Sequence, residues 1–524
     1  MELFNYLIVG SGPSGVAAAR ALEDYGVCLL DAGDTPSSIF PHDSLITALA
    51  KGDSASLLGD QYEMLINLVN SQTTHTKLRS KGLDYVLKGQ PFRIFDAQDN
   101  VLNLAGSYAA GGMSNAWGAQ LLRYTNADLL ALGDWPIKAD SLNPFYKELE
   151  NYIGISGAAD DMHRFLGDTD TLLPPSPLVP AAQYLLDRYE KYKHKKVDSA
   201  LMLGRARLAV LTENFSDYKK YTFGETEFFT TDNTGIYTAR RTLNELRSRR
   251  KIVYFGHHEV IGYKEFPEHV EVTVKNRNSQ TIEILKTRHL LLGCGTVQTA
   301  RLVLLNKNKY KYSLPFIDHP PTLIPFFIPG MFGSEIPTQS YPIQLVAGMN
   351  TKTQSEMISF YYPGGLLWSD LLPEIPLPLD TANKLLKNLL GGMLVAQIWE
   401  ASLPSVHNSL QLDENGALII KYPDRKAYGG VDALFKSLRR LGAYSLKRFV
   451  SGSPAGWGFH YAGCLPMRKT PDIFETFTDG RLWDSRRVRI IDGSVLPSLP
   501  AKNHSLTIMA NSARIANEVL GCGY

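Results

Sequence analysis

Two short polar clusters near the C-terminus have the residue types needed to move a proton. His460 lies among small and aromatic residues in the segment Gly-Phe-His-Tyr-Ala-Gly at 458–463, and Asn503 and His504 directly precede a helical pattern over 505–519. Histidine titrates near neutral pH and can accept a proton, while an amide or a second imidazole can hold an oxygen that gains negative charge. Without other signals, His460 could equally be a hydrogen-bonded histidine of the core.

A glycine-rich turn near the N-terminus has the spacing of a dinucleotide-binding site. Gly10, Gly12 and Gly15 follow an apolar strand pattern over 6–9, and Asp31 ends the next strand pattern. The first glycine permits a tight turn, the second lets the backbone approach a pyrophosphate, and the third lets the helix pack closely on the strand. The helix N-terminus attracts phosphate charge, and Asp31 can accept hydrogen bonds from a ribose. A tight turn without a ligand is the simpler alternative.

Alternating strand and helix patterns are expected to position these residues. A βαβ unit with a helix over 14–25 opens the chain, and a buried strand over 289–292 leads through Gly293 into a helix over 297–305. A β-meander is expected from strands over 252–255, 269–274 and 281–285. An Asn-Gly turn predicts a hairpin between 409–412 and 418–422. The pattern over 430–449 predicts one long amphipathic helix.

Composition and charge exclude several classes of protein. Hydrophobic residues make up 44% and charged residues 20% of the 524 positions, as in a globular chain with a large core. The net charge is +2 with no basic tail, so nucleic acid is not an expected partner. No signal peptide or transmembrane segment is visible, and we expect a cytoplasmic location. No metal-ligand spacing is present, and the cysteines are expected to be reduced: Cys28, Cys294, Cys464 and Cys522.

Further motifs occur in order over most of the chain, with looser matches in the middle. They lie at 111–118, Arg123, 133–137, 293–305, 318–320, 460–463 and 492–508. Together with the glycine turn, they resemble the glucose–methanol–choline (GMC) family of flavin oxidoreductases. The resemblance implies an α/β (mixed α+β) fold with a Rossmann-like FAD-binding domain of the glutathione-reductase type. This domain is expected to be discontinuous, and a second sheet-plus-helix domain is expected to bind the substrate. The FAD-binding domain is predicted over 1–155, 225–315 and 455–524, and the substrate domain over 156–224 and 316–454.

The resemblance also implies roles for individual residues. His460 matches the catalytic histidine of the family, and Asn503 matches its partner position, which is histidine or asparagine in relatives. A shift of one residue would give that role to His504. The helix starting near Ser505 is expected to direct its positive end at the flavin, and Asp492 to lie near the ribityl–phosphate portion. The expected cofactor-binding residues are Gly10, Gly12, Pro13, Ser14, Gly15, Asp31, Gly111, Gly112, Ser114, Asn115, Val260, Gly293, Asp492, Gly493 and Thr507.

Several positions depart from the family pattern or are expected to be structural. Some relatives attach flavin covalently through a histidine, but the corresponding positions here are Ala116 and Gly106, which predicts non-covalent FAD. Relatives often have threonine and arginine after the catalytic histidine, where this chain has Cys-Leu-Pro at 464–466, so the pocket wall differs. Cys464 is expected to be a buried, inert thiol. His319 is expected to be structural or near the domain junction rather than catalytic.

The resemblance implies oxidation of the CH–OH group of an alcohol or sugar-like substrate. His460 would remove the hydroxyl proton while hydride passes to flavin N5, and oxygen, a quinone or a redox protein could accept the electrons. A redox-neutral lyase or isomerase and a non-catalytic flavin-binding protein are the alternatives. Aromatic segments at 325–327, 360–362 and 366–368 are expected in the core, with an apolar substrate pocket as the alternative. His257 and His258 are expected at the surface.

Overall fold

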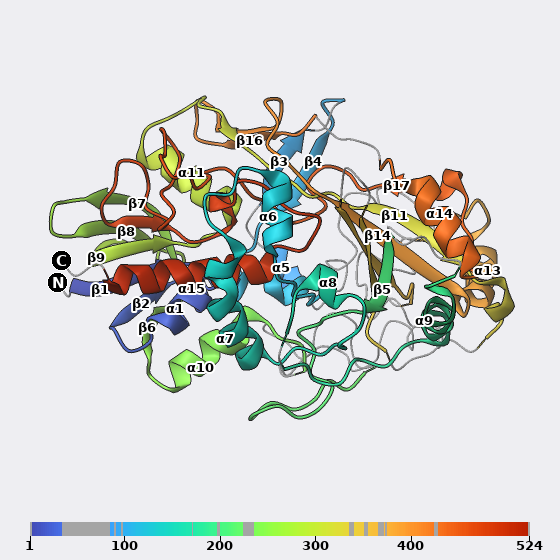
Figure 1. Ribbon diagram of the computed structural model, residues 1–524. Helices are drawn as coiled ribbons and strands as arrows, with labels where there is room; N and C mark the ends of the chain where they lie inside the picture. The colour runs from blue at the N-terminus through green and yellow to red at the C-terminus, as the bar shows by residue number, and fades with distance from the viewer. Residues whose placement is uncertain are drawn as a thin grey trace.

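In the part of the chain that the structure describes, helices cover three β-sheets. The computed structural model describes residues 3–33, 84–87, 91–95, 98–169, 171–195, 200–223, 235–334, 340–350, 355–364, 371, 375–423 and 428–521. Figure 1 shows a seven-stranded sheet toward one end and a six-stranded sheet toward the other. Both chain termini lie at the end that carries the seven-stranded sheet. The predicted segment at 366–368 lies outside the described residues.

The seven-stranded sheet carries the glycine turn. Its parallel strands are β6 (Ile252–Phe255), β2 (Val27–Leu30), β1 (Leu3–Val9), β9 (Ile282–Leu292) and β18 (Val488–Ile490). The predicted βαβ unit is present, because α1 (Pro13–Ala21) connects β1 to the parallel β2. The carboxyl ends of parallel strands meet at one edge of a sheet, which is where ligands bind in such folds. Gly10, Asp31, Gly293 and Asp492 follow four of these strands and therefore gather at this edge.

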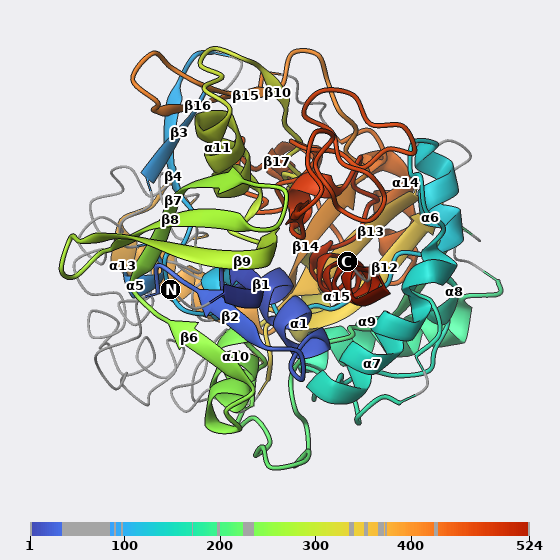
Figure 2. The same ribbon diagram turned by 90° about the vertical axis from the view of Figure 1, so that its left-hand side faces the viewer.

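Side chains alternate between the two faces of this sheet. Ile8 of β1 belongs to an apolar cluster with α1, α10 (Ala239–Ser248) and α15 (Ser505–Gly521), whereas Leu7 and Val9 belong to the cluster on the opposite face. This alternation is the period of two expected for a strand. Figure 2 shows α1 and α15 side by side against the sheet. The C-terminal helix is thereby fixed beside the N-terminal glycine turn.

The six-stranded sheet is antiparallel throughout. Its strands are, in order, β17 (Ser451–Gly452), β11 (Thr322–Phe327), β14 (Met393–Glu400), β13 (Ser355–Tyr361), β12 (Ile343–Asn350) and β5 (Leu201–Arg205). On one face, Phe360 and Ile398 belong to a cluster with α9 (Pro180–Tyr192) and α14 (Val431–Arg440). On the other face lie Ser359 and Gln397, which are paired in register. The second face is the one that contributes to the site described below.

A five-stranded sheet joins segments from both predicted domains. It consists of β10 (Leu314–Pro315), β15 (Ser409–Leu412), β16 (Leu418–Lys421), β3 (Pro91–Phe95) and β4 (Val101–Ala105). The predicted hairpin is confirmed as β15–β16. The division into two domains stays a prediction. The remaining helices are α5 (Asp84–Leu87), α6 (Asn126–Leu132), α7 (Asn143–Ile153), α8 (His163–Leu166), α11 (Thr296–Asn306) and α13 (Leu379–Leu390), with 3₁₀ turns η4 (Gly112–Ala116), η5 (Ala139–Leu142), η6 (Pro329–Met331), η7 (Lys447–Phe449) and η8 (Gly493–Val495).

The meander was predicted with the wrong set of strands. Strand β6 pairs in parallel with β2 instead of joining a meander. The antiparallel strands are β7 (His258–Glu265), β8 (Val270–Asn276) and β9, and β9 is one long strand where two runs were expected. Strand β7 escaped prediction because a register shift between Val260 and Gly262 interrupts its alternation.

The long helix predicted over 430–449 is also wrong. Helix α14 ends at Arg440, and Gly442 follows with a positive φ of 87°. Glycine adopts this left-handed conformation without the steric cost of a Cβ and commonly ends helices. The 3₁₀ turn η7 begins only at Lys447.

The part of the chain that the structure describes contains no helix with the length and apolar character needed to cross a membrane. It likewise contains no group of histidine, cysteine, aspartate and glutamate side chains arranged to bind a metal. Cys28, Cys294 and Cys464 are free thiols, and Cys522 lies outside the described residues.

Candidate active site

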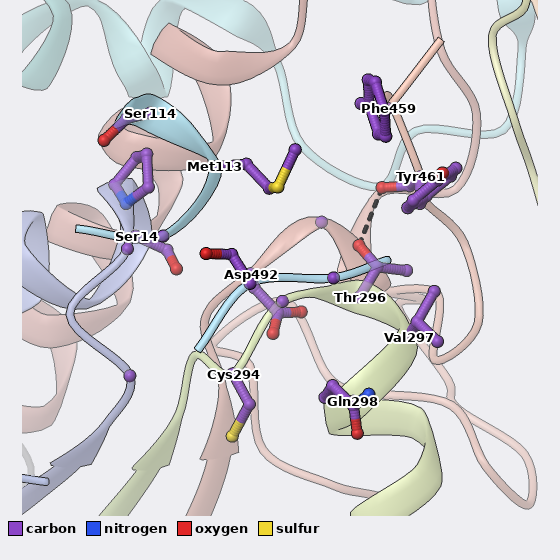
Figure 3. A pocket seen from close by; sticks show the side chains of 18 of the residues that line it. Ser14, Met113, Ser114, Cys294, Thr296, Val297, Gln298, Phe459, Tyr461 and Asp492 are labelled. Atoms are coloured by element: carbon purple, nitrogen blue, oxygen red, sulfur yellow. Dashed lines mark hydrogen bonds between the residues drawn. The ribbon is translucent and has the colours of Figure 1, made fainter. Parts of the chain in front are cut away.

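One cavity of about 540 Å³ extends from the glycine turn to the C-terminal histidines. Its wall combines the carboxyl edge of the seven-stranded sheet with residues of β13 and β14. Figure 3 shows Met113, Thr296 and Asp492 around this space, three side chains from distant parts of the sequence. The volume is in the range usual for small-molecule and cofactor sites.

The glycine turn forms one end of the cavity. Gly10 has a φ of 98°, and a Cβ there would overlap the Gly293 carbonyl oxygen, so this position requires glycine for the fold itself. Gly15 is similarly restricted, because a Cβ would overlap the Gly10 carbonyl oxygen. Gly12 differs, because it caps α1 with an ordinary φ of −62° and a Cβ there would meet nothing within 4 Å. The open space beside Gly12 belongs to the cavity.

Ser11 links the glycine turn to two other segments of the wall. Its hydroxyl donates to the Asp31 carboxylate and accepts from the Gly111 backbone N–H at 2.8 Å. Asp31 also accepts from the Gly33 N–H at 3.2 Å and is only 7% exposed. Asp31 therefore sits fixed on the cavity wall at the end of β2, where an adenosine ribose would need an acceptor.

The turn η4 brings backbone against the same space. Gly112, Met113 and Ser114 line the cavity, and the Ser114 hydroxyl bonds to the Gly111 carbonyl at 2.6 Å and accepts from Ala239 N–H at 2.9 Å. Asn115 instead donates to the carbonyls of Ala110 and Gly112 within its own loop. This hydrogen bonding holds the loop, so that its small residues present backbone to the cavity.

Asp492 closes the opposite side of the wall after β18. Its carboxylate accepts from the Thr299 hydroxyl and from the Ser494 N–H, the latter at 3.0 Å. Burial raises the pKa of Asp492, although these hydrogen bonds oppose the shift. Helix α11 begins beside it, and the Thr296 hydroxyl donates to the Tyr461 carbonyl at 2.7 Å (Figure 3). This bond connects the cofactor end of the cavity with the segment that carries His460.

His460 lies in a cluster of aromatic rings at the other end of the cavity. Its ring stacks on Trp399 with centroids 4.5 Å apart and lies 4.7 Å from the His504 ring. Nδ1 of His460 lies 3.4 Å from Nδ1 of His319. Phe459, directly before His460, has a left-handed φ of 53°, a conformation that a bulky residue adopts only where its surroundings enforce it.

The predicted partner residues lie on the same wall. Asn503 and His504 both line the cavity, and Oδ1 of Asn503 and Nδ1 of His504 are buried without a hydrogen-bond partner in the structure. Burial lowers the pKa of His504 to about 3, and the neighbouring His319 adds to the shift. His504 is therefore neutral near pH 7. Two buried polar atoms without partners are costly unless a ligand satisfies them.

The wall formed by β13, β14 and Gln120 carries uncharged polar and aromatic side chains. Gln397 and Trp399 project from the same face of β14, and Tyr361 lies on the neighbouring strand β13. Ser359, on that strand, donates to Oε1 of Gln120 at 3.1 Å, while Nε2 of Gln120 is buried without a partner. Neither Gln120 nor Gln397 could be predicted from the sequence, because neither belongs to a motif.

Most of the predicted site residues come together in this cavity. His460, Asn503 and His504 line it, as do Gly10, Gly12, Pro13, Ser14, Asp31, Gly112, Ser114, Val260, Gly293, Asp492 and Gly493. Four expected cofactor residues lie outside its lining: Gly15, Gly111, Asn115 and Thr507. Thr507 is fully buried and bonds to the Tyr146 hydroxyl at 2.7 Å. A direct role in cofactor binding stays a prediction for each of these four residues.

The structure also tests the surface and core positions predicted for three other side chains. His258 is not simply a surface residue, because it lines the cavity and its backbone N–H donates to the Asp31 carbonyl at 2.8 Å. Tyr361 lines the cavity, whereas Phe360 and Tyr362 face the core, as the period of a strand requires. Cys464 is confirmed as a buried thiol, and burial raises its pKa.

The place of a second thiol, Cys294, in the cavity wall was not predicted. Cys294 lines the cavity, and burial together with the nearby Asp492 carboxylate raises its pKa to about 12. At that pKa it stays a thiol near neutral pH, because the thiolate would form only under strongly basic conditions. Its position directly after Gly293, in the predicted strand–glycine–helix segment, could have indicated its place.

Residues 429–512 match the family model described as GMC oxidoreductase. The GMC resemblance is therefore confirmed. The matched GMC segment includes His460, Asp492, Asn503 and His504. A GMC oxidoreductase domain indicates a flavoprotein and supports flavin-dependent oxidation in general. No curated protein matches the chain by sequence.

Solved structures extend the likeness in fold over nearly the whole chain. Pyridoxine 4-oxidase from Mesorbium loti matches with a TM-score of 0.61 and 15% identity, covering 99% of this chain and 100% of that chain. A variant of formate oxidase from Aspergillus oryzae, described for its FAD modification, matches with a TM-score of 0.61 and 13% identity over 99% and 98%. At such identities the likeness concerns the fold. The predicted mixed α/β fold with a Rossmann-type domain is confirmed.

The residues of the cavity fit FAD. The open space beside Gly12 is not needed for packing, since a Cβ there would touch no protein atom within 4 Å. The N-terminus of α1 faces this space and would favour a phosphate charge. Asp31 offers a buried acceptor on the same wall. These features match the needs of a dinucleotide at one end of a cavity that reaches His460 at the other.

Proposed function

We propose that this protein is an FAD-dependent oxidoreductase that oxidises the CH–OH group of an uncharged alcohol. The observation that carries the proposal is the single cavity that begins at the glycine turn and ends at His460, Asn503 and His504. FAD, when bound, supplies the acceptor for a hydride. The protein supplies binding, orientation and the removal of a proton.

Four elements of the wall would hold FAD. Asp31 would bind the adenosine ribose, and the turn at Gly12 with the start of α1 would bind the pyrophosphate. Backbone at Gly112 and Ser114 would lie against the cofactor, and Asp492 would face its ribityl–phosphate portion. The N-terminus of α15 follows His504 directly and would favour negative charge in its neighbourhood.

Removal of the hydroxyl proton is assigned to His460. Asn503 and His504 carry the unpartnered buried atoms beside it, and a hydroxyl group can both donate and accept hydrogen bonds. The side-chain amide of Asn503 can donate an N–H to the substrate oxygen, which leaves the hydroxyl proton directed toward His460. Because both residues line the cavity, separate Asn503→Ala and His504→Ala variants would show which one holds the oxygen, through the larger loss in the rate of flavin reduction.

The wall around His460 favours a substrate without charge. Gln120, Tyr361, Gln397 and Trp399 line the cavity on this side, and none of them is ionisable near pH 7. The pKa of His504, lowered to about 3, keeps that neighbouring ring uncharged as well. A carboxylate or ammonium group placed here would lose its hydration without gaining an opposite charge. Planar or apolar parts of a substrate can instead pack on the aromatic rings.

Anaerobic reduction of the bound flavin tests this function. Purified holoprotein is mixed with a panel of alcohols that includes benzyl alcohol and its charged analogue 4-(hydroxymethyl)benzoate, and the flavin absorbance is followed. We expect neutral alcohols to bleach the flavin and the charged analogue to be much slower. Absence of bleaching by every alcohol would refute the proposed oxidation, and turnover without bleaching would point to the redox-neutral chemistry. Faster reduction by the charged analogue would refute the proposed substrate class.

Non-covalent attachment is part of the proposal. Gly106 and Ala116 both line the cavity and have no side chain able to bond to the flavin. Acid precipitation of the holoprotein should therefore release all the yellow colour into the supernatant. Colour that stays in the washed pellet would contradict this prediction.

A further inference from the structure

His319 is a buried imidazole that the proposed chemistry does not use directly. It is 1% exposed and does not line the cavity, yet its ring lies against both His460 and Trp399. The Trp399 ring is 4.9 Å from His319 and stacks on His460, so the three rings form one packed group. A histidine that only filled core space would not need to direct a ring nitrogen at His460.

The hydrogen bonds of His319 determine which of its nitrogens carries the proton. Nε2 of His319 contacts the backbone carbonyl oxygen of Glu400, and a carbonyl oxygen only accepts. Nε2 must therefore carry a hydrogen. Burial lowers the pKa of His319 to about 4, so near neutral pH the ring has one proton and its Nδ1 is an acceptor.

The acceptor of His319 faces His460. The two Nδ1 atoms are 3.4 Å apart, and since Nδ1 of His319 carries no proton, the hydrogen between them must belong to His460. The separation is long for a hydrogen bond, as is usual for catalytic pairs before a ligand is bound. With its proton on Nδ1, a neutral His460 has an unprotonated Nε2.

We propose that His319 is a positioning residue that fixes the tautomer of His460, so that Nε2 of His460 accepts the proton of the substrate hydroxyl. After the transfer, His460 is a cation whose Nδ1–H still points at the His319 acceptor, which stabilises the charge. The carbonyl of Glu400, at the end of β14, thus orients the His319 ring, and His319 in turn orients the reacting nitrogen of His460. This inference rests on the proposed function of His460 as the base.

The position of His319 is itself fixed by its neighbours. Its backbone N–H donates to Oδ1 of Asp318 at 2.8 Å, and the other carboxylate oxygen accepts from the Gly456 N–H. A Cβ at Gly458 would overlap the His319 carbonyl oxygen, so only glycine lets the His460 segment pass this close. Both histidines therefore sit on segments that are locked to each other, as a defined ring-to-ring geometry requires.

A matched pair of variants tests the assignment. His319→Asn keeps an acceptor near the position of Nδ1, whereas His319→Phe keeps a ring without an acceptor. Both lose the bond from Nε2 to the Glu400 carbonyl, so that loss cancels in the comparison. The readout is ring-nitrogen NMR of FAD-bound protein with isotopically labelled histidine, in which the His460 signals are those missing from His460→Gln.

We expect the wild type and His319→Asn to show His460 with its proton on Nδ1, and His319→Phe to show a shift toward Nε2–H. Flavin reduction in His319→Phe should slow by about 10- to 100-fold, as for other partners that orient a functional histidine, and His319→Asn should recover most of that rate.

A wild-type His460 with its proton on Nε2, or an unchanged tautomer in His319→Phe, would overturn the proposal. The wild-type measurement decides even if a variant fails to fold. Because the tautomer is read without substrate, a protein that oxidises no alcohol but shows the expected tautomer would refute the proposed function and leave the ring geometry intact.

Discussion

Replacing Gly12 by alanine should weaken FAD binding while leaving the apoprotein stable. Gly12 has an extended conformation, φ −62° and ψ 178°, that any residue adopts, and its added Cβ would meet nothing within 4 Å. Loss of a flexible glycine stabilises by about 0.4–1 kcal/mol, while alanine is a poorer helix N-cap than glycine, so the net change in unfolding free energy should be below about 1 kcal/mol. The methyl group enters the cavity where the pyrophosphate would approach the backbone. Loss of one hydrogen bond to a charged group costs about 1.5–3 kcal/mol, which raises Kd roughly 10- to 150-fold.

The assay combines urea unfolding of the apoprotein with titration of FAD by fluorescence quenching. Gly10→Ala is the matched control, because its φ of 98° and the overlap with the Gly293 carbonyl should destabilise the fold itself by more than about 1 kcal/mol. The comparison thereby distinguishes Gly12, which we expect FAD binding to require, from Gly10, which we expect the fold to require. A Gly12→Ala protein with unchanged FAD affinity, or with a large loss of apoprotein stability, would refute the reasoning.

Two further predictions concern buried charges. Burial lowers the pKa of His289 to about 4, of His319 to about 4 and of His504 to about 3. Below pH 6.5, the ordinary pKa of histidine, the unfolded chain therefore binds more protons than the folded chain. The free energy of unfolding should be full above pH 6.5 and fall on acidification by up to about 1.4 kcal/mol per pH unit for each ring. Urea unfolding at stepped pH should show this slope, less steep in His289→Gln, and a flat profile from pH 6.5 to 4 would contradict it. Lys502 is 1% exposed and its ammonium lies 2.6 Å from Asp128, so Lys502→Met should lose up to about 3–5 kcal/mol, because the Asp128 carboxylate would keep its hydrogen bonds from Thr125 but lose its counter-charge. Adding Asp128→Asn should restore part of that stability, and a stable single variant would contradict the account.

The glycine turn and the first βαβ unit could be predicted because their signals are local. The positive φ of Gly10 and the close approach of Gly15 to the Gly10 carbonyl act within a few residues, and Asp31 follows the next strand at the expected distance. The C-terminal residues were predicted only through the family resemblance. On residue type alone, His460 had equal grounds to be a core histidine.

The wall formed by β13, β14 and Gln120 could not be predicted, because sheet pairing assembles it. Gln397 and Ser359 are paired on the neighbouring strands β14 and β13. Ser359 donates a hydrogen bond to Gln120, which lies 239 residues earlier in the sequence. No short motif encodes such a contact. The place of Tyr361 could not be predicted, because successive aromatic residues on a strand point to opposite faces of the sheet. Only the orientation of the sheet determines which ring lines the cavity. His319 was expected to be structural or near the domain junction rather than catalytic. Its contact with His460 joins segments 141 residues apart, so no local pattern indicates it.

Pre-steady-state reduction of the bound flavin in wild-type and His460→Ala proteins tests the central claim most directly. A neutral alcohol that bleaches the wild-type flavin is mixed anaerobically with each holoprotein, after FAD content and unfolding free energy have been shown to match. Because general base catalysis contributes typically 10²- to 10⁴-fold, the account predicts a loss of about that size in the reduction rate. Equal reduction rates in the two proteins would contradict the assignment of His460 as the group that removes the proton.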